Sequence, residues 1–249
     1  MGLSQAGFHH EAVIERDRYA CDTIRENQRW GVEPVVHWPL RELDVREVDY
    51  STMTNNVDLL AGGPPCQPFS FGGKHRGSND SRDMFPEVVR ATRELAPRAL
   101  LFENVRGLLR PTFAHYFRYI LLQISFPEVV KRTNEAWSDH LRRLDDHRAH
   151  SGRDGLTYRA TFADPDAADY GVPQRRRRVL IVGFRNDVAQ DWAFPTATHS
   201  RDALLWEQLG TGEYWERHEI ARRDRPPTVA RPMRRDVVQA RLIPPTTKP

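Results

Sequence analysis

The chain has only two cysteines among its 249 residues, Cys21 and Cys66. Neither a disulfide framework nor a zinc cluster can be built from so few thiols alone. Cys21 lies in a segment of helical spacing, where a small buried thiol is the ordinary role, and Cys66 lies in a proline-rich loop. An unpaired thiol in a reducing compartment is free to do chemistry.

Long apolar runs are also missing. No stretch approaches the roughly 20 apolar residues that span a bilayer, and no basic segment followed by an apolar stretch marks a secretory signal. We therefore expect a cytoplasmic protein with no membrane contact. The 39% of hydrophobic residues suffice for one globular domain with a core, or for one domain and part of a second.

Charge and composition both change near residue 200. Residues 201–249 hold 10 basic and 7 acidic residues, so they carry the whole net charge of +3 and residues 1–200 are formally neutral. The same tail is rich in Trp, Arg and Pro. We predict one domain over 1–200, with 201–249 a linker or the stub of another domain. A weak basic excess is compatible with a polyanionic partner, although a solvated surface is the commoner explanation.

Short apolar runs alternate with longer segments of helical period, the pattern of a mostly parallel sheet covered by helices. The predicted fold class is therefore α/β. The strands are expected at residues 12–15, 35–38, 57–61, 99–103, 156–162 and 179–184. The helices are expected at residues 17–27, 83–95, 113–124 and 135–150.

The strongest motif follows the third predicted strand. It reads Gly62-Gly63-Pro64-Pro65-Cys66-Gln67-Pro68-Phe69-Ser70. The glycines allow a sharp exit from the strand and the prolines stiffen the loop, so Cys66 stands beyond the carboxyl end of a strand, where open α/β sheets bind ligands. A lone Pro-Cys pair is more often a structural turn. The full string resembles the nucleophile motif of the C5-cytosine methyltransferases.

Two further motifs occur in the family's order. Glu103-Asn104-Val105 ends the next strand, so its carboxyl group points toward the same crevice as Cys66 and is suited to proton donation. The other motif is Gln174-Arg175-Arg176-Arg177-Arg178, which precedes the last strand. Because side chains alternate along an extended chain, Arg176 and Arg178 share one face, and they match the arginines of the family's Gln-x-Arg-x-Arg pattern.

Residues near the start resemble the cofactor half of the same family. There, the acid after the second strand bonds the ribose hydroxyls of S-adenosylmethionine, which assigns this role to Glu15 and places Arg16 near the adenine. Asp44 and Val45 match the adenine-binding position, although a surface acid explains Asp44 equally well. Pro64 completes the expected cofactor contacts.

The resemblance implies a Rossmann-like methyltransferase sheet that transfers a methyl group from S-adenosylmethionine to C5 of a cytosine flipped out of double-stranded DNA. Cys66 would attack C6, Glu103 would bond the ring at N3, and Arg178, helped by Arg176, would hold O2. Contacts to the substrate are expected from Pro65, Gln67, Ser70 and Asn104. No metal is expected.

The chain departs from the family at both ends. The Gly-rich turn that opens the family would lie just before Met1, and its closing motifs are not found before Pro249. Without the first central strand, we expect either a split in the sheet or the two flanking strands pulled together, with poor folding and no activity for the chain by itself. A complementing chain is one way to supply the rest. An inactive remnant that at most binds nucleic acid, and a transfer-RNA cytosine methyltransferase, are the alternatives; the absence of a Cys-Phe-Thr tripeptide favours DNA.

Overall fold

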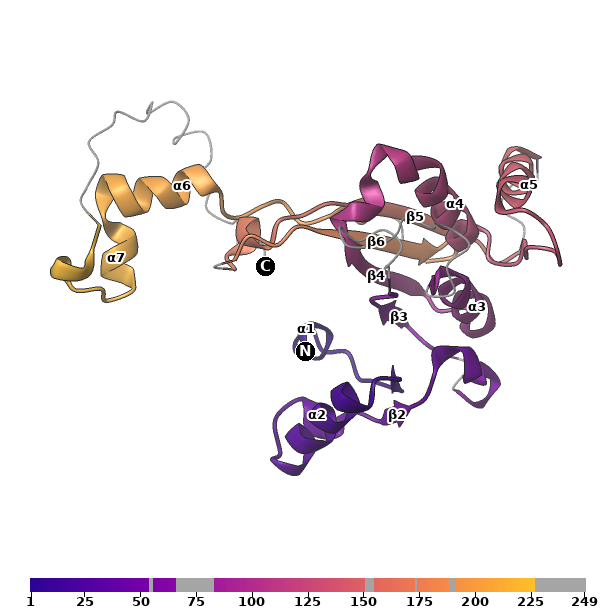
Figure 1. The fold of residues 1–249 in the computed structure, drawn as a ribbon, viewed down its shortest axis with the longest axis horizontal. Helices are drawn as coiled ribbons and strands as arrows, with labels where there is room; N and C mark the ends of the chain where they lie inside the picture. The colour runs from indigo at the N-terminus through magenta and orange to yellow at the C-terminus, as the bar shows by residue number, and fades with distance from the viewer. Residues whose placement is uncertain (54–55, 66–82, 151–154, 173, 189–190, 227–249) are drawn as a thin grey trace. The chain divides into compact units, whose positions relative to one another are not determined.

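The computed structural model of the chain describes residues 1–53, 56–65, 83–150, 155–172, 174–188 and 191–226 (Figure 1). The chain forms two compact units. The first comprises Met1–Ala163 and Val179–Trp192, and the second comprises Asp164–Arg178 and Ala193–Pro249. The domain boundary expected near residue 200 stays a prediction. In the described ranges, no helix is both long enough and apolar enough to cross a membrane.

Strands and helices alternate along the chain. The strands are β1 (Val13–Glu15), β2 (Leu40–Glu42), β3 (Leu59–Gly62), β4 (Ala99–Val105), β5 (Tyr158–Ala163) and β6 (Arg178–Arg185). The helices are α1 (Gly2–Gln5), α2 (Arg18–Arg29), α3 (Phe85–Leu95), α4 (Ala114–Ser125), α5 (Trp137–His150), α6 (Arg201–Trp206) and α7 (Glu213–Arg217). The four predicted helices correspond to α2, α3, α4 and α5.

The described strands form two separate sheets. β1 and β2 pair in parallel, with Val13 opposite Leu40. The larger sheet has the order β3-β4-β6-β5, in which β3 and β4 are parallel and β5 and β6 are antiparallel. The α/β fold class is therefore confirmed, with a mixed sheet. The division into two sheets is the split that the sequence led us to expect.

One predicted strand, at residues 35–38, is wrong. Val35–His37 forms a 3-10 turn, and the backbone N–H of Trp38 donates to the carbonyl of Val35 at 3.0 Å. Adjacent valines favour a strand. However, only four residues lie between Pro34 and Pro39, and the turn satisfies backbone groups of these four residues locally. Pairing with β1 therefore begins after this turn, and β2 is the strand that forms.

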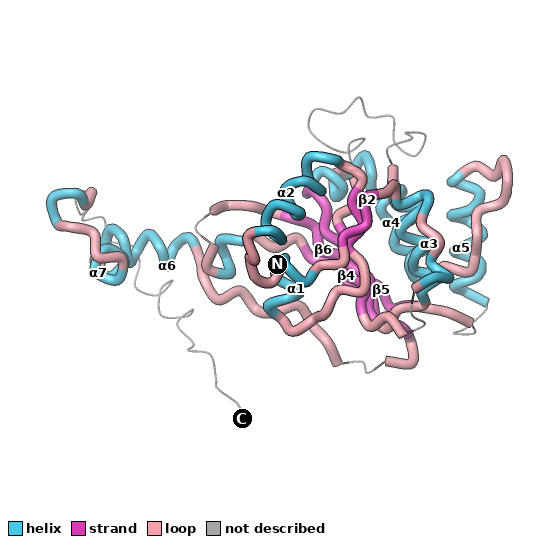
Figure 2. The backbone as a smooth tube through the Cα atoms, turned by 90° about the horizontal axis from the view of Figure 1, so that it is seen from below, coloured by secondary structure: helices cyan, strands magenta, loops and turns pink. Residues whose placement is uncertain are grey.

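The main hydrophobic core lies where α3 and α4 pack on the larger sheet. Along β4 every second residue is buried, namely Leu100, Phe102 and Asn104, as the alternation of side chains requires. Ile120 and Ile124 of α4 are fully buried in the same core. α3 packs against α4, and α4 packs against α5 and β5 (Figure 2). The helices thus hold β4 in place from one side.

Within the first unit, Arg90 binds the segment after β2 to α3. Its guanidinium donates to the carbonyls of Val45 at 2.8 Å and Val48 at 3.0 Å, and it lies 4.7 Å from the ring centre of Tyr50. Val48 and Tyr50 are buried in a second apolar cluster, against which Leu60 of β3 packs. Because Arg90 bonds backbone groups, it holds this segment independently of most side-chain identities.

His140 of α5 is the most deeply buried titratable ring, with 1% of its surface exposed. Its Nε2 lies 2.7 Å from the carbonyl of Val129 and its Nδ1 lies 2.8 Å from the hydroxyl of Tyr119. A carbonyl only accepts, so Nε2 carries the proton and Nδ1 accepts from Tyr119. Burial lowers the pKa of His140 below its usual value, because the charged ring would lose its hydration.

We therefore predict that the chain loses stability as the pH falls from 7.5 to 5.5. Below about 6.5 the unfolded chain protonates this histidine while the folded chain does not, so the free energy of unfolding falls by up to roughly 1.4 kcal/mol per pH unit. Urea unfolding at several pH values measures this slope. His140→Gln should flatten it, whereas His115→Gln, on the exposed face of α4, should not. Equal slopes in the two variants would contradict the assignment.

Candidate active site

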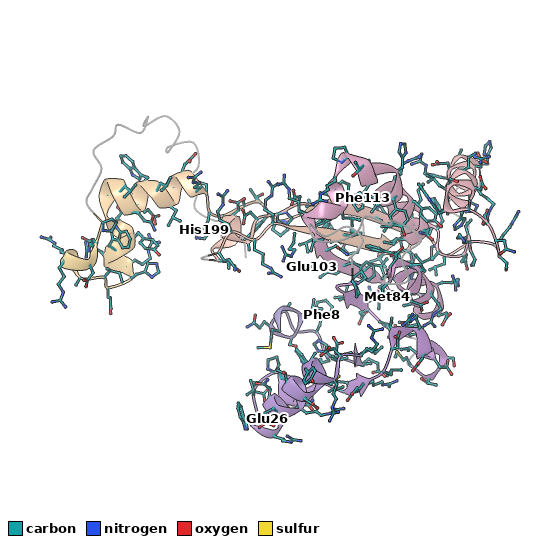
Figure 3. The ribbon with its side chains drawn as sticks, in the orientation of Figure 1. Phe8, Glu26, Met84, Glu103, Phe113 and His199 are labelled. Atoms are coloured by element: carbon teal, nitrogen blue, oxygen red, sulfur yellow. The ribbon has the colours of Figure 1, made fainter. Side chains whose placement is uncertain are left out.

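The carboxyl ends of β3 and β4 bring together two motifs that are 40 residues apart in sequence. Gly62 lies opposite Phe102 in the parallel register, so Gly63 and Glu103 follow side by side. A Cβ atom added to Gly63 would lie 3.5 Å from Oε2 of Glu103. Glu103 is labelled in Figure 3. The absence of a side chain at Gly63 therefore leaves the space beside the Glu103 carboxyl group open.

Asn104 joins the two strand ends directly. Its Nδ2 donates to the carbonyl of Pro64 at 3.1 Å, and its Oδ1 accepts from the backbone N–H of Val105 at 2.8 Å. Only 3% of Asn104 is exposed, so its amide acts from inside the fold. This bond fixes the first proline of the loop against the end of β4. Pro65, the next residue, is exposed.

The remaining members of the cysteine motif, Cys66, Gln67 and Ser70, lie outside the described residues. Cys66 follows Pro64 by two residues in the sequence, so its loop starts from the fixed point at Asn104. Cys21, by contrast, is fully buried in α2, and its thiol lies 3.4 Å from the carbonyl oxygen of Glu15. Burial raises the pKa of the Cys21 thiol, which disfavours the reactive thiolate.

Glu15 ends β1 and organises the turn into α2. Its Oε1 accepts from the backbone N–H groups of Arg16 and Asp17, both at 2.7 Å, and Asp17 in turn caps α2 through Ala20. Oε2 of Glu15 forms no hydrogen bond with a described residue. One carboxylate oxygen therefore fixes the turn, and the other is available to a hydroxyl group.

Asp44 is held between two arginines. Arg46 donates to both of its carboxylate oxygens, at 2.9 and 2.6 Å, and Nη1 of Arg16 donates at 3.0 Å. These bonds, foremost those from Arg46, keep the pKa of Asp44 far below its usual range. The structure thus brings Arg16 and Asp44 together, and their shared role in binding a cofactor stays a prediction. It also shows Asp44 orienting arginines, which the sequence did not indicate. The carbonyl of the adjacent Val45 is taken by Arg90.

In the second unit, the four consecutive arginines differ in their hydrogen-bond and ion-pair partners. Arg177 forms an ion pair with Asp164 at 2.7 Å, and Arg175 lies 3.8 Å from a carboxylate oxygen of Asp166. The Arg176 side chain forms no hydrogen bond or ion pair with a described residue. Nη1 of Arg178 donates to the carbonyl of Arg177 at 2.9 Å. Arg175 and Arg177 thus lie near acids of the same unit, and the shared pocket face of Arg176 and Arg178 stays a prediction.

Asp166 is a structural residue that the sequence analysis missed. Its Oδ1 accepts from the backbone N–H groups of Arg176 at 2.8 Å and Ala168 at 3.2 Å, which closes the turn before β6. Burial opposes ionisation here, but these N–H groups and the neighbouring Arg175 and Arg177 outweigh it and lower the pKa of Asp166. Its position ten residues before Arg176 carries no local pattern that reveals the contact.

Comparison with known proteins identifies the family. The model of the C-5 cytosine-specific DNA methylase family matches residues 1–126 and 153–216. Type II methyltransferase M.NgoMIV of Neisseria gonorrhoeae is 35% identical over 209 residues, which are 84% of this chain and 55% of that protein. Type II methyltransferase M.Eco47II of Escherichia coli is 33% identical over 219 residues, 87% of this chain and 44% of that protein.

The chain thus spans about half the length of these curated relatives. Among solved structures, a Spodoptera frugiperda DNMT2 mutant aligns at a TM-score of 0.43 and 19% identity, covering 78% of this chain and 48% of that chain. The family match covers the cysteine motif, Glu103 and the arginine run, and leaves out residues 127–152 and 217–249. The chain belongs to the C-5 cytosine-specific DNA methylase family.

Proposed function

We propose that the protein transfers a methyl group from S-adenosylmethionine to C5 of cytosine in double-stranded DNA. One observation carries the proposal: the parallel ends of β3 and β4 set the start of the Cys66 loop beside Glu103, with Asn104 bonded to Pro64. A nucleophile and a proton donor are needed on one ring; Glu103 lies at this edge, and Cys66 follows Pro64 by two residues in the sequence. The names of the relatives, all Type II methyltransferases, favour DNA over transfer RNA.

The reaction begins with the Cys66 thiolate, which forms a bond to C6 of a cytosine flipped out of the duplex. The electron pair of the C5–C6 double bond moves into the ring, where Glu103 donates a proton or hydrogen bond at N3. Arg178, helped by Arg176, holds O2 as negative charge develops. Pro65, Gln67 and Ser70 would contact the base, and Asn104 would act on it through the loop that it holds at Pro64. A hydroxyl group in place of the thiol would be a poorer nucleophile near neutral pH.

S-adenosylmethionine, when bound, supplies an electrophilic methyl group for C5. Glu15 would hold it through the ribose hydroxyls, because Oε2 of this carboxylate has no described partner while Oε1 keeps the turn in place. Arg16, oriented by Asp44, would lie along the adenine with Val45, and Pro64 would contact the reacting end. Loss of the C5 proton, with elimination of Cys66 as the thiolate, then restores the aromatic ring.

We predict that Cys66, and not Cys21, forms the covalent bond to the base. DNA that contains 5-fluorocytosine blocks loss of the C5 substituent, so a full-length version of the enzyme, with segments added before Met1 and after Pro249, should be trapped on it. Mass spectrometry of the peptides locates the adduct. Cys66→Ser should abolish it, and Cys21→Ser should leave it in place, since Cys21 is a fully buried helix residue. An adduct on Cys21 would contradict the assignment.

We also predict that the four arginines differ in their effect on turnover. Arg178→Ala should lower kcat by the equivalent of about 2.7–4 kcal/mol, the usual loss for a donor to developing charge. Arg175→Ala is the matched control in the same run, because Arg175 is exposed and turned toward Asp166. Steady-state kinetics of both variants of the full-length version measures the difference. Equal decreases of kcat in the two variants would show that Arg178 does not face the pocket while Arg175 points away from it.

A further inference from the structure

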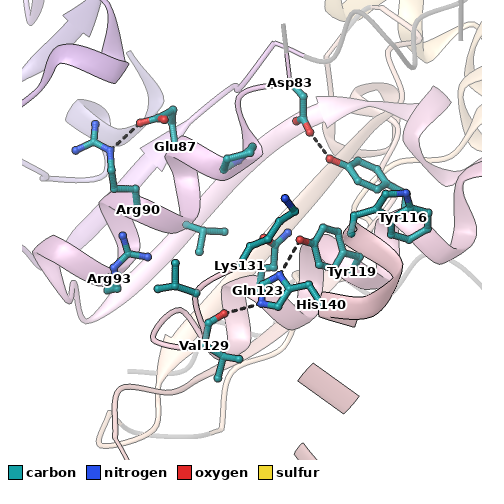
Figure 4. A pocket seen from close by; sticks show the side chains of 14 residues that line it. Asp83, Glu87, Arg90, Arg93, Tyr116, Tyr119, Gln123, Val129, Lys131 and His140 are labelled. Carbon is teal, nitrogen blue, oxygen red and sulfur yellow. Dashed lines mark hydrogen bonds and ion pairs between the residues drawn. The ribbon is translucent and has the colours of Figure 1, made fainter. Parts of the chain in front are cut away.

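A cavity lies between α3, α4 and the segment that leads into α5 (Figure 4). Its volume is about 380 Å³, within the range of small-molecule sites. Neither Pro64 nor Glu103 nor Asn104 lines it. The family model leaves residues 127–152 unmatched, and this segment supplies one wall through Lys131, Trp137 and His140. The cavity therefore depends on a part of the chain that the family pattern does not describe.

The wall formed by this segment is fixed from both ends. His140 bonds the carbonyl of Val129 and the hydroxyl of Tyr119, so α5 and the preceding loop are tied to α4. Arg143 donates to Glu135 at 2.9 and 3.0 Å and to the carbonyl of Val130 at 2.7 Å. The bonds from Arg143 lower the pKa of Glu135 to about 2, so the pair stays ionised. A cavity held in this way is preorganised for a ligand.

The polar groups that remain available in the cavity are mainly donors. Gln123 is only 7% exposed, and its amide forms no hydrogen bond with a described residue. Lys131 forms no ion pair among the residues that the structure describes. In Figure 4, Gln123 and Lys131 lie between Arg93 on one side and Tyr119 on the other. Arg93 donates to the carbonyl of Pro127 at 3.3 Å and lies 3.8 Å from Glu94.

The acids of the cavity are already engaged. Asp83 accepts a hydrogen bond from the Tyr116 hydroxyl, and Glu87 pairs with Arg90 at 2.7 Å. Neither of these acids forms an ion pair with Lys131 or Arg93. An entering ligand therefore meets two cations. These cations favour a ligand that carries negative charge.

Aromatic rings also line the cavity. Trp137 lies with its ring centre 5.7 Å from that of Tyr116 and 5.8 Å from that of Tyr119. Tyr116 and Tyr119 are buried, so they support Trp137, which is partly exposed and offers an apolar face against which a flat ring packs. The side-chain amide of a glutamine carries both a donor and an acceptor, the pair that matches the edge of adenine.

We propose that this cavity binds an adenine nucleotide. The base packs on the Tyr119 and Trp137 side and meets the amide of Gln123, and the phosphate pairs with Lys131 and Arg93. A free mononucleotide and an unpaired nucleotide of a DNA strand share this chemistry. The site does not depend on the proposed methyl transfer, because none of its residues belongs to the β3–β4 edge.

Calorimetric titration of the 249-residue chain with AMP tests the proposal. One site is expected, with adenosine and inorganic phosphate each binding about tenfold more weakly than AMP, since each lacks half of the contacts. Lys131→Ala should weaken AMP binding by about tenfold, and Gln123→Leu should do the same. Arg132→Ala is the matched control, because this exposed neighbour of Lys131 does not line the cavity.

Competition experiments distinguish a free mononucleotide from an unpaired nucleotide of DNA, and a further variant distinguishes this cavity from the β3–β4 edge. Displacement of AMP by a short single-stranded oligodeoxyadenylate identifies an unpaired nucleotide as the ligand, and no displacement identifies the free mononucleotide. Glu103→Gln should leave AMP binding unchanged even where it abolishes methyl transfer, so failure of one proposal is distinct from failure of the other. Absence of AMP binding, or unchanged affinity in Lys131→Ala, would each overturn the site.

Discussion

The parallel pairing of β3 with β4 is the constraint on which the candidate active site depends. Parallel strands present their carboxyl ends at one edge of a sheet, so the register that sets Gly62 against Phe102 also sets the cysteine loop against Glu103. The buried amide of Asn104 then ties that loop to β4 through Pro64. Loss of this bond would leave a buried donor without a partner, at a cost of roughly 1–3 kcal/mol.

Arg90 connects the segment that follows the smaller sheet to α3. β1 and β2 form no ladder with β3 in the described part of the chain, yet the apolar cluster of Val48 and Tyr50 meets Leu60 of β3. Arg90 reaches two backbone carbonyls of the intervening segment from α3. The proposed cofactor side and the proposed base side are therefore linked through α3 rather than through a continuous sheet.

Much of this arrangement follows from the sequence, and the exceptions have physical reasons. Short apolar runs predicted β1, β3, β4, β5 and β6, and the Gly-Gly-Pro-Pro-Cys string predicted the edge. The strand predicted at residues 35–38 is wrong because the flanking prolines confine these residues to a turn. The two arginines on Asp44 and the turn closed by Asp166 arise from contacts that no local spacing encodes. The cavity beside Gln123 was equally hidden, since two helices and a distant loop form it only after packing.

Release of tritium from DNA labelled at C5 of cytosine tests the assignment of the β3–β4 edge most directly. A methyl group can be added at C5 only if the C5 proton leaves, so a full-length version of the enzyme should release tritium with S-adenosylmethionine and form an equal amount of 5-methylcytosine. Glu103→Gln should suppress both, and Glu94→Gln, on an exposed part of α3, should suppress neither. Methylated cytosine that retains its tritium, or full release by Glu103→Gln, would contradict the assignment.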